Sequence, residues 1–83
     1  MEFPAFRHET VTPSDTVELP IDVVAIIVID GGDVSMEDRF GTVIVYPSVP
    51  AYTTFESFIP AHIRATGTTA TNIIMWRSGE ETI

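Results

Sequence analysis

An apolar run at residues 21–29, Ile-Asp-Val-Val-Ala-Ile-Ile-Val-Ile, constrains the fold of this chain more than any other feature. Most of its side chains are β-branched, and such side chains pack well on a pleated sheet but are stiff in a helix. The run therefore predicts a β-strand. One alternating face is wholly apolar, and the other is apolar in its middle, at Val24, Ile26 and Val28. We expect a second sheet or another chain to cover this second face.

Length and charge exclude several function classes. The run is far shorter than the roughly 20 residues that a membrane-spanning helix needs. The chain has four arginines, no lysine and twelve acidic residues, for a net charge of −8. Nucleic-acid binding requires positive charge that displaces counterions, so we expect no nucleic-acid partner and no membrane partner. The opening Met-Glu-Phe-Pro has no basic segment before an apolar one, and no signal peptide is predicted.

Small size makes extra stabilisation necessary. A domain of 83 residues hides only about 60–65% of the surface that its unfolded chain exposes. The chain has no cysteine, so it forms no disulfide, and two histidines without cysteines make a poor zinc site. We therefore predict no cofactor and no metal, and we expect oligomerisation or docking onto a larger body.

The remaining sequence is punctuated by glycine and proline between short apolar segments, which is typical of an all-β domain. Besides 21–29, strands are predicted at 8–12, 33–36, 42–46, 61–66 and 68–76, with extended or irregular structure at 51–58. The Gly31-Gly32 pair predicts a hairpin between 21–29 and 33–36. The predicted fold is a small antiparallel β-sandwich or barrel of five to seven short strands.

We divide the chain into an extended N-terminal arm (1–7), one β domain (8–76) and a flexible C-terminal tail (77–83). The arm contains two aromatic residues, Phe3 and Phe6, that are available to anchor on a neighbour. An ordinary terminus that folds onto its own core is the equal alternative.

Candidate catalytic and metal-binding residues are sparse. Asp30, Asp33, Glu37 and Asp38 cluster near one turn, but their spacing does not match a calcium-binding EF-hand loop, and a solvated acidic turn explains them better. His8 and His62 have no partners in the sequence that would indicate a metal site or acid–base chemistry. No nucleophile elbow and no glycine-rich phosphate loop is present. We therefore predict that the protein is not an enzyme.

Four aromatic residues raise a different possibility. Tyr46, Tyr52, Phe55 and Trp76 are able to form a platform on which a sugar ring stacks. Such residues are more often core or interface anchors, which remains the favoured interpretation.

Two stretches together carry a family resemblance. One is Val-Thr-Pro-Ser-Asp-Thr at 11–16, followed by Leu19-Pro20, and the other is Ala-Thr-Gly-Thr-Thr-Ala-Thr-Asn-Ile at 65–73, ending in Trp76. Between them lie Gly32-Asp33-Val34, Gly41-Thr42-Val43 and Val49-Pro50. In this order the segments resemble a family of small virion proteins from tailed phages, which includes the head-spike base protein of the alphaproteobacterial gene transfer agent.

The resemblance implies a capsid decoration, cement or head-spike base protein on the surface of the phage head, assembled in the host cytoplasm. Its implied partners are the major capsid protein, further copies of itself and a spike fibre protein; a trimer is favoured and a pentamer is the alternative. A glycan-binding module of a phage spike or tail is the alternative function. The candidate oligomer or capsid contacts are Phe3, Phe6, Val24, Ile26, Val28, Tyr52, Phe55 and Phe58.

Overall fold

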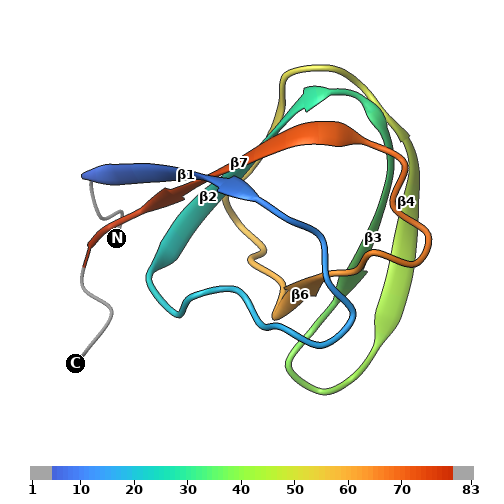
Figure 1. Cartoon of the computed structure of the whole chain (residues 1–83), viewed down its shortest axis with the longest axis horizontal. Coiled ribbons are helices and arrows are strands. Elements are labelled where there is room, and N and C mark those ends of the chain that lie inside the picture. Colours follow the sequence, from blue (N-terminus) through green and yellow to red (C-terminus); the bar gives the residue numbers. More distant parts are fainter. Residues whose placement is uncertain (1–4, 80–83) are drawn as a thin grey trace.

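The computed structural model describes residues 5–79 and confirms the all-β fold (Figure 1). Its seven strands are β1 (Arg7–Val11), β2 (Val23–Asp30), β3 (Gly32–Glu37), β4 (Val43–Val49), β5 (Thr53–Phe55), β6 (His62–Ile63) and β7 (Thr71–Arg77). The predicted strands are all present in part, although β6 is much shorter than expected and β4 continues past Pro47. No helix that could cross a membrane occurs within the described residues.

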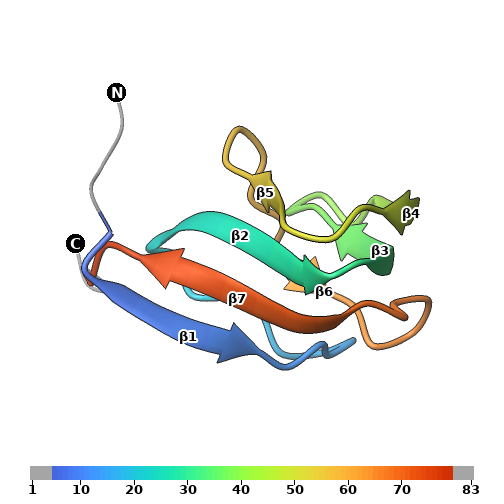
Figure 2. The same cartoon turned by 90° about the horizontal axis from the view of Figure 1, so that it is seen from above.

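The strands form two antiparallel sheets around one core. The four-stranded sheet has the order β1-β7-β2-β5, and the three-stranded sheet has the order β4-β3-β6. Figure 2 shows β1, β7 and β2 side by side, with β3 and β4 beyond them. The core draws on both sheets, and its members include Ile26, Val28, Val34, Met36, Ile63, Ile73 and Met75.

Strand β2 lies between β7 and β5, and it is buried as the sequence predicts. Its alternation is not regular, however, because the pairing with β7 shifts register between Val23 and Ala25. Val23 is therefore directed into the core together with Ile26 and Val28, and Val24 is only half-buried. The prediction that Val24 shares one face of the strand with Ile26 and Val28 was therefore wrong. The sequence contains no signal for this bulge.

The Gly31-Gly32 hairpin prediction was also wrong. Strands β2 and β3 belong to different sheets, so the glycine pair carries the chain from one sheet to the other. A Cβ atom at Gly31 would overlap the carbonyl oxygen of Val49, and one at Gly32 would lie 2.9 Å from the Cα of Ala70. Glycine is required here because two other backbone segments approach closely.

Candidate interaction surfaces

The two segments that carry the family resemblance are bonded to each other. Asp15 accepts a hydrogen bond from the backbone N–H of Thr66 at 3.0 Å and another from its hydroxyl at 2.6 Å. The N–H of Ser14 donates to the carbonyl of Ile63 at 2.8 Å. Polar bonds thus join these two segments, which lie in loops distant from each other in the sequence. We call the contact between Asp15 and Thr66 the Asp15–Thr66 latch.

The Thr66 hydroxyl and then its backbone N–H stabilise the charged form of Asp15, and the Arg64 guanidinium adds to this. Together they hold the pKa of Asp15 below its ordinary value despite some desolvation. Arg64 also donates to Glu37 at 2.8 Å, and Nδ1 of His62 lies 3.7 Å from the same carboxylate. His62 therefore belongs to a structural polar cluster, as expected for a histidine next to a carboxylate.

The threonines of the second segment close over strand β3. The hydroxyl oxygen of Thr68 accepts the N–H of Ser35 at 3.0 Å, and that of Thr69 accepts the N–H of Asp33 at 2.9 Å. These bonds satisfy backbone donors of a strand whose middle is buried on both faces. The threonine-rich segment thus fixes a loop against β3.

A second polar cluster lies beside the last residues of β7. Nε of Arg77 donates to the buried Asp22 at 2.8 Å, and the N–H of Gly79 donates to the same carboxylate at 2.9 Å. Arg77 also pairs with Glu9 of β1. Burial raises the pKa of Asp22, but the bonds from Arg77 and Gly79 outweigh it, so the net pKa lies below its ordinary value.

The acidic residues near the β2–β4 region do not share a site. Asp38 accepts two backbone N–H groups of its own turn, Asp33 accepts the N–H of Ser48, and Asp30 bonds with Thr71 and Asn72. Glu37 pairs with Arg64. Within residues 5–79, no three potential metal ligands are grouped around a common point. Each acid instead has its own local partner.

The predicted contact residues fall into three classes. Phe6, Tyr52 and Phe58 expose 77%, 74% and 40% of their surface and are available for contact. Ile26 and Val28 have no exposed surface because the core of the same chain covers them. Val24 and Phe55 are half-buried, and Phe3 lies outside the described residues.

Of the four aromatic residues proposed as a sugar platform, Tyr46 and Phe55 lie together, but Trp76 does not join them. Tyr46 and Phe55 pack edge to face, with ring centroids 5.9 Å apart, against the core. Trp76 follows the core residue Met75 in β7 and is therefore directed to the opposite face of the sheet. This separation removes the observation that favoured glycan binding.

The β3–β4 hairpin presents a surface that the sequence did not reveal. One carboxylate oxygen of Asp38 accepts the N–H groups of Phe40 and Thr42 at 2.8 and 2.9 Å, which fixes the turn. Phe40 is 94% exposed at its tip. The only signal was an aromatic residue inside an acidic turn.

Strand β4 extends this apolar surface. Val43, Ile44 and Val45 each expose between 44% and 54% of their surface. Among the strands of residues 5–79 it pairs only with β3, so it is an outer edge of its sheet, and its seven residues carry no charge. Native edge strands are commonly protected by charges or by covering segments. Because successive strand residues alternate between the two faces of a sheet, Val43 and Val45 lie on one face of β4 and Ile44 lies on the other. We call the exposed residues Phe40, Val43 and Val45 the hairpin patch.

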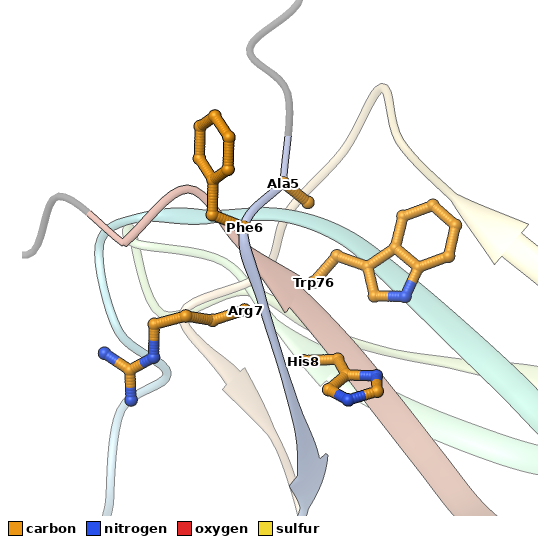
Figure 3. Close-up of a pocket in the computed structure, with 5 residues that line it drawn as sticks. All are labelled: Ala5, Phe6, Arg7, His8 and Trp76. Atoms are coloured by element: carbon orange, nitrogen blue, oxygen red, sulfur yellow. The ribbon is translucent and has the colours of Figure 1, made fainter.

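An open pocket of about 420 Å³ lies at the start of β1 (Figure 3). It is lined by Ala5, Phe6, Arg7, His8 and Trp76, with no acidic residue among them. His8 and Trp76 lie next to each other on one side of β1, where they are register partners, while the Arg7 side chain turns to the other side. We call this the β1 pocket.

Neither a protein-family model nor a curated protein matches the sequence. A chain in the solved capsid of a native GTA particle does match, with a TM-score of 0.75 and 33% sequence identity. The match covers 89% of this chain and 84% of that chain. The match supports a structural protein of phage or GTA type.

The match confirms the resemblance at the level of a structural protein of phage or GTA type. It extends over most of the β domain, and so it takes in both sheets rather than a single motif. In this chain, the two segments that signalled the relationship are joined by the Asp15–Thr66 latch.

Proposed function

We propose that this protein is attached to the capsid of a phage-type particle, as a decoration, cement or head-spike base protein that binds the major capsid protein. The observation that carries the proposal is the 33% identity, over 89% of the chain, to a chain of the GTA capsid. Its place of action is the head surface, after assembly in the host cytoplasm. A spike fibre protein is a further proposed partner.

The proposed mechanism is non-catalytic and depends on protein contacts. Burial of apolar surface contributes about 25 cal/mol per Å², and the chain exposes apolar side chains at Tyr52 and Phe58 as well as in the hairpin patch. The Asp15–Thr66 latch fixes the loops before binding. Contacts made by pre-ordered loops lose less entropy on binding.

The protein is proposed to act as a homo-oligomer, because shell components follow the symmetry of the particle. The trimer favoured by the sequence corresponds to a three-fold position, and the pentamer corresponds to a vertex. Native mass spectrometry of the purified chain distinguishes the two.

The direct test is binding of the purified chain to particles that lack it. We expect saturable binding with a fixed copy number per particle, measured by sedimentation and by cryo-electron microscopy. Absence of binding to these particles would refute the proposal. Tyr52→Ser and Phe58→Ser should lower occupancy if these residues face the shell, whereas Val17→Ser, which also removes an exposed apolar side chain, is the matched control.

A further inference from the structure

Within residues 5–79, the residues other than glycine that have positive φ angles all bond to the segment that carries the chain from β2 to β3. They are Ser48 (φ 51°), Tyr52 (φ 63°) and Asn72 (φ 53°). Their partners are the carboxylate of Asp33, the carbonyl of Ile29 and the carboxylate of Asp30, respectively. Backbone strain of this kind gathers at functional sites and persists only where the surrounding structure fixes it. We call the region that comprises Asp30, Asp33, Ser48, Tyr52 and Asn72 the Tyr52 end.

Tyr52 is the exceptional residue among these three. Asparagine is one of the residues that adopt positive φ most readily, whereas bulky side chains seldom do so, and glycine does so at no steric cost. The Tyr52 side chain adds little packing within its own chain, because 74% of the residue is exposed. A tyrosine at this position therefore weakens the turn without strengthening the core.

Three contacts hold the turn in this conformation. The N–H of Tyr52 donates to the carbonyl of Ile29 at 3.3 Å, and the hydroxyl of Thr53 donates to the carbonyl of Pro50 at 2.7 Å. The backbone nitrogen of Ala51 lies so close to Gly31 that a Cβ atom on this glycine would be 2.9 Å from it. The turn thus presents an exposed ring on a fixed backbone, and pre-ordered groups lose less entropy on binding.

The cationic side chains of the protein lie away from the Tyr52 end. Arg7 and Arg77 are register partners where β2 begins, whereas the Tyr52 end lies where β2 ends. Arg64 bonds to Glu37, the last residue of β3, and Arg39 lies in the turn that follows. The Tyr52 end lies at the beginning of β3. All four arginines are therefore near the other ends of these two strands.

The chemistry of the Tyr52 end suits a cationic partner. Asp30 is exposed and Asp33 is partly buried, so carboxylates accompany the exposed ring. Arginine and lysine bind both to the face of a tyrosine ring and to carboxylates. A second copy of this chain is less suitable, because its net charge is −8 and like charges would meet.

We propose that Tyr52 is the anchor by which this protein contacts a surface of the capsid shell that presents arginine or lysine. This inference rests on the proposed function, and it goes further by naming the residue and the chemistry of the partner surface. Aromatic anchors often dominate the energy of an interface. The ring then favours binding while its backbone conformation disfavours folding, so substitution should have opposite effects on the two.

Substitutions at Tyr52 separate these two effects. Tyr52→Gly removes both the strain and the ring, Tyr52→Asn introduces a residue that tolerates the conformation, and Tyr52→Phe keeps the strain and the ring. Val17→Gly is the matched control, because Val17 is an exposed apolar residue that is not among those with positive φ. Urea unfolding measures the stability of the purified chains, and sedimentation measures their affinity for particles that lack this protein.

We expect Tyr52→Gly and Tyr52→Asn to unfold at higher urea concentrations than the wild type, while their affinity for particles falls by about tenfold or more. Tyr52→Phe should match the wild type in both measurements. Val17→Gly should unfold at a lower urea concentration, because glycine gains entropy in the unfolded chain, and should bind particles normally. A Tyr52→Gly chain that is no more stable than the wild type, or that binds particles with undiminished affinity, would overturn the inference.

A second pair of variants tests the charge of the partner surface. Asp30→Asn removes a charge from the Tyr52 end but keeps an acceptor oxygen for Thr71 and Asn72. Glu18→Gln removes a charge from an exposed acid between β1 and β2. We expect Asp30→Asn, but not Glu18→Gln, to weaken particle binding and to reduce its dependence on salt concentration. If Asp30→Asn binds with the affinity and salt dependence of the wild type, the partner surface is not cationic and the inference falls.

Particle binding by the wild-type chain separates this inference from the proposed function. If the wild type and Tyr52→Gly bind particles equally, the proposed function stands and the anchor role of Tyr52 is refuted. If the wild type does not bind particles, the proposed function is refuted and the inference falls with it. Binding to a glycan array that Tyr52→Gly abolishes, with particle binding unchanged, would show that the ring serves a sugar and would also overturn the inference.

Discussion

Strands β1 and β4 are both outer edges of a sheet, but their side chains differ in charge. β1 carries charged and polar residues, and its Glu9 pairs with Arg77 of the neighbouring strand. β4 carries no charge, and three of its apolar side chains are about half exposed. The first edge is joined to its neighbouring strand by an ion pair, whereas the second presents exposed apolar side chains that a partner could contact.

The two edges also differ in how polar interactions join them to the rest of the domain. Charged edge residues discourage pairing with another chain, and the β1 end is joined to the domain by the cluster of Glu9, Asp22 and Arg77. The β4 end has only the local bonds of Asp38 to stiffen its turn. We expect substitutions at the β1 end to change folding stability and substitutions at the β4 end to change association.

The largest effect is expected at the β1 end. Arg77→Met removes the cation that faces Asp22, whose side chain is 1% exposed. An unpaired buried carboxylate costs about 3–5 kcal/mol of unfolding free energy. Urea unfolding measures this loss. Arg39→Met, an exposed site, should change stability by less than about 0.5 kcal/mol.

The double variant Asp22→Asn/Arg77→Met sharpens this result, because it removes both charges. It should recover part of the loss, since the buried charge is then gone. A single Arg77→Met variant as stable as the wild type would show that the cluster does not hold the β1 end.

Acid should weaken the same cluster. The pKa of Asp22 lies below its ordinary value of 3.8 in the folded chain. A carboxyl group with a lowered folded pKa stabilises the protein above the unfolded pKa, and that stability is lost as the pH falls through the folded value. The urea concentration at the unfolding midpoint should therefore decrease as the pH is lowered below about 4.

Asp15 contributes to the same acid dependence, because its pKa is also lowered by Thr66 and Arg64. Asp15→Asn should therefore show a smaller decline of the urea midpoint between pH 6 and pH 3 than the wild type. A wild-type midpoint that does not change over this range would contradict the assignment for both carboxylates.

Much of the fold follows from local sequence. The β-branched density of residues 21–29 predicted the buried strand β2, and glycine and proline marked the limits of most other strands. The errors arose where distant backbone segments meet. Gly31 and Gly32 are needed for close approach to Val49 and Ala70, and no local pattern distinguishes this from a hairpin.

The interaction surfaces were less predictable. Phe6, Tyr52 and Phe58 were identified as contact candidates from aromatic residues in weak strand segments, and they are exposed. Ile26 and Val28 lie in the core because the second sheet of the same chain covers them. Phe40 was not identified from the sequence, because its exposure depends on the turn that Asp38 fixes in the folded hairpin.

A moderate effect is expected from the turn at the β4 end. Asp38→Ala removes the acceptor for the N–H groups of Phe40 and Thr42, both of which are exposed and can bond with water instead. We expect a loss of about 1 kcal/mol in urea unfolding and weaker association of the chains. Glu56→Ala, at an exposed acid outside the turn, is the control. Loss of stability without any change in association would argue that the fixed turn does not serve the contact.

The smallest effect on stability is expected at Val43, where an added charge tests whether chains associate through the β4 edge. Val43 lies directly opposite Glu37 in the β3–β4 register. Val43→Lys therefore gains an opposite-charge pair across the strands, and stability should change by less than about 1 kcal/mol. The same lysine charges an edge that is otherwise neutral, so association should be lost. Light scattering over a range of concentrations measures this, with Thr10→Val on β1 as the control that should leave association unchanged. If Val43→Lys chains associate as strongly as the wild type, β4 is not the open edge, and the distinction between the two outer strands fails.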